Sequence, residues 1–262
     1  MRSDDDLIGW ARAGDGAELR FGRGDDDDRA PRAEDGGRPG PAPGEHAGIG
    51  RRRFLAASVA LGLSGVAARG RAGVLCGAAV ATSPGPFYPG ELPERADLVV
   101  RPGRTERARG SILRLSGVVR DRACRVLPGA VVEIWQADSA GRYKHRRAPE
   151  QDLLDPHFAY FGRTQCDADG VYRFRTIVPT SYRFAGVTRA AHIHIRIAHP
   201  DHGDMITEMY FAGAEHDRVR RQDRVFQERP AGLRDGLIVE RVPIAAAAVP
   251  QAWRARFDMQ LG

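Results

Sequence analysis

The stretch Ala191-His192-Ile193-His194-Ile195-Arg196-Ile197 alternates strictly between small or apolar side chains and polar ones. Residues two apart on a β-strand point to the same face, so this pattern predicts a strand with an isoleucine face and a histidine face. Two imidazoles side by side are costly in an apolar setting unless the nitrogens of both rings have a partner, and a metal ion can bind both rings. The pair alone leaves a metal site and a surface histidine pair equally open.

The sequence around this stretch is also typical of strands. Short runs rich in β-branched and aromatic residues are separated by turn sequences such as Pro128-Gly129 and Asp167–Gly170. Only Asp217–Gln227 favours a helix. Many short strands without helical periodicity predict an all-β fold, a β-sandwich of mixed strands with long loops. The predicted strands are 112–119, 130–136, 163–166, 171–175, 191–197, 206–211 and 237–242.

The N-terminal part differs in composition. Residues 1–50 are dominated by Gly, Asp, Arg, Pro and Ala, so we expect a disordered extension, or a start codon assigned too early. Residues 51–80 begin with Arg51-Arg52-Arg53-Phe54-Leu55 and continue with a mildly apolar run, which resembles a twin-arginine export signal with a linker. The run is too short for a comfortable membrane span, and a buried helix is the alternative. We therefore expect residues 81–262 to form the β-sandwich domain of a periplasmic or extracellular protein with no stable membrane span.

The net charge of +6 does not indicate nucleic-acid binding. Lys144 is the only lysine and asparagine is absent, which suggests GC-rich coding. The arginines are scattered and form no stripe, so we expect no nucleic-acid partner. The three cysteines have no zinc-ribbon spacing, and Cys124 and Cys166 either pair in an oxidising compartment or are two buried small residues.

Two tyrosines complete the set of candidate site residues. Tyr143 follows the turn Asp138–Arg142, and Tyr182 stands shortly before the histidine strand. Either tyrosine alone would be interpreted as a packing or interface residue.

Taken together, the motifs resemble the intradiol ring-cleavage dioxygenases, nearest to the protocatechuate 3,4-dioxygenase type. The resemblance extends from about Gly85 to Gly213, roughly half of the chain, and matches nothing after Gly213. The matching stretches, in the family's order, are Gly85–Pro89, Pro128–Asp138, Gly141–Tyr143, Leu154–Pro156, Asp167–Ile177 and Arg189–His194.

The resemblance implies a non-haem Fe(III) centre held by Tyr143, Tyr182, His192 and His194. It implies that Tyr182 takes up a substrate proton and that Arg189 stabilises negative charge on the substrate. The reaction it implies is insertion of both atoms of O2 into a catechol-type substrate, with intradiol cleavage to a cis,cis-muconate-type diacid. Two further residues are implied as substrate-binding, Phe184 as a pocket aromatic and Glu208 where relatives commonly carry glutamine.

The donor set suits this chemistry, because two phenolates are hard anionic ligands that favour Fe(III) over Fe(II) or zinc. Tyrosine ionises near pH 10, so a neutral-pH phenolate requires a bound cation. Two alternatives remain, a metal oxygenase that uses only the histidines and an exported β-sandwich binding module without catalysis. The sequence leaves open which catechol is bound, and we expect any homo-oligomer to form through the sandwich itself.

Overall fold

The computed structural model describes residues 76–78, 80–245 and 251–262. The expected extension 1–50 and nearly all of the expected signal segment 51–80 lie outside these residues. Strands in two mixed sheets dominate the described part, which confirms the all-β prediction. Among the described residues, no helix combines the length and apolar character needed to cross a membrane.

The first sheet, sheet I, is built around the long strand β1 (Ile112–Arg120). Strand β4 (Val171–Ile177) pairs with it antiparallel, whereas β11 (Ala252–Arg256) and β12 (Met259–Gln260) pair with it parallel. Strand β10 (Val242–Pro243) extends the sheet beside β11. The C-terminal strands β11 and β12 therefore both pair directly with β1.

The second sheet, sheet II, has the order β3-β2-β7-β8-β9. Its strands are β3 (Phe161–Gln165), β2 (Val131–Gln136), β7 (His192–His199), β8 (Gly203–Phe211) and β9 (Ile238–Val239). The central strand β7 pairs antiparallel with both neighbours, and β9 pairs parallel with β8. The histidine stretch thus lies in the middle of a sheet, where its backbone is hydrogen-bonded on both sides.

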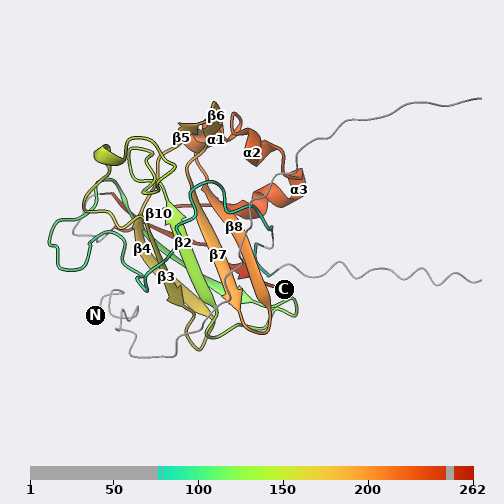
Figure 1. Ribbon diagram of the computed structural model, residues 1–262. Coiled ribbons are helices and arrows are strands. Elements are labelled where there is room, and N and C mark those ends of the chain that lie inside the picture. The colour runs from blue at the N-terminus through green and yellow to red at the C-terminus, as the bar shows by residue number, and fades with distance from the viewer. Residues whose placement is uncertain (1–75, 79, 246–250) are drawn as a thin grey trace, which may run out of the picture. The chain divides into compact units, whose positions relative to one another are not determined.

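The two sheets share one hydrophobic core, as expected of a sandwich (Figure 1). Leu113 and Phe174 of sheet I and Ile134, Ile193 and Ile195 of sheet II are all fully buried in it. Ile193 and Ile195 point into this core. His192 and His194 alternate with them along β7, so they point to the outer face of sheet II.

A second, smaller cluster covers that outer face. It consists of Phe87, Trp135, Ala137, Tyr143 and Ala148, with Tyr88, Phe161, Tyr182, Phe184 and Ile206 packed against it. A short hairpin of β5 (Tyr182–Phe184) and β6 (Val187–Arg189) contributes to it. Strand β7 is therefore buried on both faces, which encloses its histidines.

The segment after Gly213 departs from our prediction. The single helix expected over Asp217–Gln227 is wrong, because α1 (Ala214–Arg220) ends and α2 (Arg224–Gln227) starts again after Asp223. The carboxylate of Asp223 accepts a hydrogen bond from the backbone N–H of Phe226 and so caps the new helix. A third helix, α3 (Ala231–Arg234), and two 3-10 turns, η2 (Gln151–Leu153) and η3 (Asp235–Leu237), complete the helical elements.

The strand predictions need two further corrections. The run 237–242 is not one strand, because Leu237 ends η3 and the chain then divides into β9 and β10. Strands β5, β6, β11 and β12 were not predicted. Strands β5, β6 and β12 are only two or three residues long, and the sequence of β11 mixes alanine, tryptophan and arginine without a clear apolar face. None of the four therefore showed a recognisable strand pattern.

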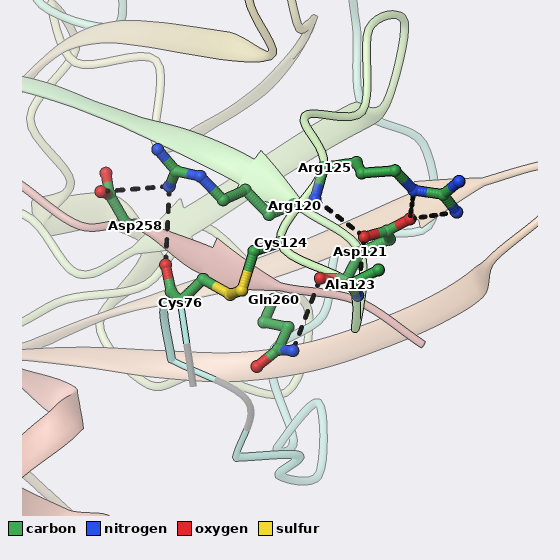
Figure 2. The surroundings of a disulfide bond; sticks show 8 residues. All are labelled: Cys76, Arg120, Asp121, Ala123, Cys124, Arg125, Asp258 and Gln260. Atoms are coloured by element: carbon green, nitrogen blue, oxygen red, sulfur yellow. Dashed lines mark hydrogen bonds and ion pairs between the residues drawn. A yellow bond between two sulfur atoms is a disulfide. The ribbon is translucent and has the colours of Figure 1, made fainter. Parts of the chain in front are cut away.

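The disulfide joins Cys76 to Cys124, and Cys166 is free and buried, so the pairing of Cys124 with Cys166 is wrong (Figure 2). Cys166 lies at the end of β3 inside the core, where burial raises the pKa of its thiol to about 12. Figure 2 shows the bridge beside Arg120, whose guanidinium contacts the carbonyl of Cys76 and the carboxylate of Asp258. The bridge thus ties the start of the described chain to the loop after β1.

We expect the double replacement Cys76→Ser and Cys124→Ser to lower the free energy of unfolding by about 2–4 kcal/mol. The physical reason is that the bridge closes a loop with a sequence separation of 48 residues and so restricts the unfolded chain. Urea unfolding with and without a reductant measures the effect. Reductant should destabilise the natural protein but leave the double variant unchanged, and an equal response of both would contradict the prediction.

Candidate active site

The site is built on the outer face of sheet II, where neighbouring strands place side chains side by side. Register pairs Trp135 of β2 and Glu208 of β8 with His194, and Tyr210 of β8 with His192. The indole of Trp135 stacks on the imidazole of His194, with ring centroids 4.8 Å apart and planes only 1° from parallel. All five side chains are almost completely buried. The rigid sheet therefore fixes both histidines before any ligand arrives.

The two imidazoles face each other through their Nε2 atoms, which lie 3.2 Å apart. Nδ1 of His192 is 2.6 Å from the carbonyl oxygen of Ala190, and a carbonyl only accepts, so Nδ1 carries the proton and Nε2 presents a lone pair. Burial lowers the pKa of His192 well below its usual value and that of His194 to about 4. Both are therefore neutral imidazoles, the form that binds metals.

Two tyrosines lie beside the histidines, and each one influences the pKa of the other. The hydroxyl of Tyr143 lies 3.5 Å from Nε2 of His192. The ring centroid of Tyr182 is 5.2 Å from that of Tyr143 and 5.8 Å from that of His192. Two phenols and two neutral imidazoles thus converge from β5, β7 and the loop after β2.

The loop that carries Tyr143 is held by Asp138. Its carboxylate accepts hydrogen bonds from the backbone N–H groups of Ala140 and Arg142, and from the hydroxyl of Tyr160. Gly141 completes the turn with a φ of 82°, a left-handed conformation that favours glycine. The side chain of Tyr143 then packs on Phe87, with ring centroids 4.7 Å apart.

The phenols are protonated when no cation is present. Burial raises the pKa of Tyr143 well above its usual value near 10, and burial raises the pKa of Tyr182 to about 12. A trivalent cation is the kind of partner that would reverse this, because it favours the phenolate form of both side chains. The donor set therefore fits Fe(III), with Tyr143, Tyr182, His192 and His194 as the residues that would hold it.

Backbone also approaches the site closely at Gly85. A Cβ built there would lie 3.3 Å from Cε1 and 3.6 Å from Nε2 of His194. Gly85 therefore packs against the Cε1–Nε2 edge of that imidazole, and any side chain at position 85 would press on it.

Part of the chain is similar to curated dioxygenases. The chain is 37% identical over 133 residues to a protocatechuate 3,4-dioxygenase beta chain from Burkholderia cepacia, covering 49% of this chain and 55% of the relative. It is 30% identical over 181 residues to a catechol 1,2-dioxygenase from a Pseudomonas species, covering 63% and 56%. The chain thus spans about half the length of the curated relatives it matches.

A family model described as Dioxygenase matches residues 84–262, which is more than half of the chain. The chain belongs to the intradiol ring-cleavage dioxygenase family. Among solved structures, the dioxygenase domain of a carbohydrate-binding fusion protein from Streptomyces sp. SirexAA-E is similar, with 28% identity and a TM-score of 0.51, over 70% of this chain and 97% of that one. A 3-chlorocatechol 1,2-dioxygenase from Rhodococcus opacus shares the fold, with 22% identity and a TM-score of 0.55, over 70% and 72%.

The intradiol family model extends to residue 262, beyond the Gly213 limit of the motif resemblance. The segment after Gly213 supplies two site neighbours that sequence reasoning missed, Asp223 and Arg229. Arg189 donates from Nη2 to Glu208 at 2.9 Å and from Nε to Asp223 at 3.3 Å. Arg229 also donates to Glu208. No periodic or motif signal marked either residue, because their role depends on where α2 packs.

A cavity lies next to the two tyrosines. It has a volume of about 210 Å³ and is lined by both tyrosines, Phe87 and Phe184, among others. Phe184 packs edge-on against Phe87, with ring centroids 4.8 Å apart. The cavity is smaller than the ~300–1,000 Å³ typical of drug-sized ligands, which suits a single aromatic ring.

Glu208 does not line this cavity. Its carboxylate lies 3.5 Å from Nδ1 of His194, and the ligand atoms of His192, His194 and Glu208 all lie within 4.8 Å of one another. Both of its oxygens accept hydrogen bonds, from Arg189, Arg229 and Tyr210. As a metal ligand it would have to give these up, so the tyrosines are the better candidates.

Proposed function

We propose that this chain is a non-haem Fe(III) dioxygenase that inserts both atoms of O2 into a catechol-type substrate, with intradiol ring cleavage to a cis,cis-muconate-type diacid. The observation that carries the proposal is the convergence of two phenols and two neutral imidazoles, with Tyr143 3.5 Å from His192 and the two Nε2 atoms 3.2 Å apart. The names of the curated relatives support the reaction class.

Bound ferric iron would act as a Lewis acid that the catecholate chelates, and it would make the ring reactive toward O2. The chain's own residues have distinct roles. Phe87 and Phe184 hold the aromatic ring in the cavity. The hydroxyl oxygen of Tyr182 would take a substrate hydroxyl proton, because burial raises the pKa of this phenol to about 12 when no cation contacts it.

Arg189 is the residue we propose to stabilise negative charge on the substrate. It is buried next to the site, and its charge is one of the influences on the pKa of both Tyr182 and His192. A buried guanidinium acts strongly on nearby charge because little water screens it. Its contacts with Glu208 and Asp223 hold it in place in advance.

The decisive experiment is reconstitution of the purified protein with Fe(III). A burgundy-red tyrosinate-to-iron band, oxygen uptake with catechols and an ultraviolet spectrum of a muconate-type product are expected. The cluster of His192, His194 and Glu208 favours one alternative, a metal oxygenase that uses the histidines without the tyrosines. A colourless iron protein would point to that alternative, and failure to bind iron would point to a binding module.

Gly85→Ala is expected to lower both the affinity for Fe(III) and kcat/KM roughly tenfold. A catalytic group displaced by ~1 Å can lower the rate by about 10²-fold, and the displacement of His194 should be smaller than that. The added Cβ, 3.3 Å from His194, would push the imidazole away, and the φ of 68° adds strain. Chelator competition and oxygen uptake measure the effect. Gly129→Ala is the matched control, with a φ of 74° and nothing within 4 Å. Equal losses in both variants would mean that backbone strain alone is responsible.

We also propose export by the twin-arginine pathway to the periplasm or the exterior. The disulfide between Cys76 and Cys124 supports it, because such bonds persist mainly in oxidising compartments. Replacing Arg51, Arg52 and Arg53 by lysine and fractionating the cells tests the proposal. Retention of the enzyme in the cytoplasm is expected, and unchanged export would exclude this route.

A further inference from the structure

A compact cluster of charges lies next to the proposed iron site, and none of its members lines the cavity. It contains two carboxylates, Asp223 and Glu208, and two guanidiniums, Arg189 and Arg229. Both carboxylates are almost inaccessible, with side-chain exposures of 0% and 3%. Buried charges are stable only when each has partners, and here the charges balance.

The residues that flank helix α2 supply half of this cluster. Asp223 accepts hydrogen bonds from the backbone N–H of Ala190 at 2.9 Å and from Nε of Arg189, while its other oxygen caps α2. Arg229, just past α2, reaches the far oxygen of Glu208 and donates to the hydroxyl of Tyr210 at 3.2 Å. Figure 1 shows α1 and α2 beside β5 and β6 at one end of sheet II.

Glu208 connects this cluster to a proposed metal ligand. Oε1 accepts from Arg189 and lies 3.5 Å from Nδ1 of His194, a buried nitrogen with no hydrogen-bond partner among the described residues. Oε2 accepts from Tyr210 at 2.6 Å and from Arg229. A carboxylate on the non-binding nitrogen of a metal-binding histidine fixes the ring and its tautomer.

We propose that Arg229 is a positioning residue of this site, which holds the carboxylate of Glu208 where it orients both His194 and Arg189. The proposal rests on the proposed function. A neutral amide at position 208 would leave one of the two guanidiniums without a counter-charge, so Glu208 and Arg229 form a matched pair. Loss of either partner alone then disturbs the site more than loss of both.

The test compares Arg229→Met with Arg224→Met, an exposed arginine of the same helical segment. Arg229→Met is expected to weaken Fe(III) binding, measured by chelator competition, by roughly 10–100-fold, as removal of outer-shell partners does. It should also shift the visible band, whereas Arg224→Met leaves both unchanged and Arg229→Lys restores part of the affinity. An Arg229→Met protein with natural affinity and spectrum would overturn the proposal.

A second arm keeps the test valid if Arg229→Met does not fold. The double variant of Glu208→Gln with Arg229→Met is expected to bind Fe(III) more tightly than Glu208→Gln alone. A double variant that binds no more tightly would overturn the pairing of the two residues.

A metal-free readout separates this proposal from the proposed function. In ¹⁵N NMR of the apoprotein, His194 should be protonated at Nδ1 in the natural protein and mixed between tautomers in Arg229→Met. Failure of the natural protein to bind iron overturns the proposed function, while an unchanged tautomer in Arg229→Met overturns the role of Arg229.

Discussion

Tyr143→Phe is expected to lower kcat/KM for a catechol by about 10³-fold or more, since a metal ligand contributes several kcal/mol to charge stabilisation. The ring of the replacement still stacks on Phe87, so the fold should persist. What is lost is the oxygen 3.5 Å from Nε2 of His192. The visible band of the Fe(III) protein should weaken and shift, because only Tyr182 can still ionise.

The matched control for Tyr143→Phe is Tyr172→Phe. Tyr172 is equally buried, and its hydroxyl donates to the carbonyl of Phe257 at 2.6 Å, far from the site in sheet I. This variant should lose about 1–2 kcal/mol of stability but keep its iron, colour and activity. Combining Tyr143→Phe with Tyr182→Phe should abolish the band. A band that survives in this double variant would show that neither tyrosine binds the metal.

Gly117→Ala is expected to lower the free energy of unfolding by about 3 kcal/mol or more. This is the upper end of the loss that an extra carbon atom causes in a well-packed core. The added Cβ would lie 1.9 Å from the carbonyl oxygen of Phe257 and 2.8 Å from the ring of Tyr172. Backbone at this contact cannot move easily, because the N–H of Phe257 donates to Ser116 at 2.9 Å. Thermal and urea unfolding measure the loss.

The control for this prediction is Gly90→Ala, since a Cβ at Gly90 meets nothing within 4 Å. Gly90→Ala should leave the unfolding midpoint unchanged. If Gly117→Ala were as stable as this control, the close contact between Phe257 and Gly117 of β1 would be wrong.

The strands with a strong alternating pattern could be predicted because that pattern is local. In β7, the isoleucines face the core and the histidines face the site, as the sequence required. The elements that were missed, such as β11 and the break between α1 and α2, depend on distant partners. Strand β11 is defined by its parallel pairing with β1, more than a hundred residues earlier in the chain.

The positions of the four proposed ligands also followed from the sequence, through short motifs in a fixed order. Their neighbours did not. Gly85 and Arg229 reach His194 and Glu208 from segments that carry no periodic signal, and Cys76 pairs with Cys124 across a sequence separation of 48 residues.

By itself, then, the sequence determined the alternation of the strands, the residue types available for a metal and the family motifs. Only the tertiary structure decided which cysteines pair, where the C-terminal strands insert and which charges surround Glu208. The reason is physical: the side-chain period of a strand is set by its own backbone, whereas contacts between distant segments are set by the packing of the whole core.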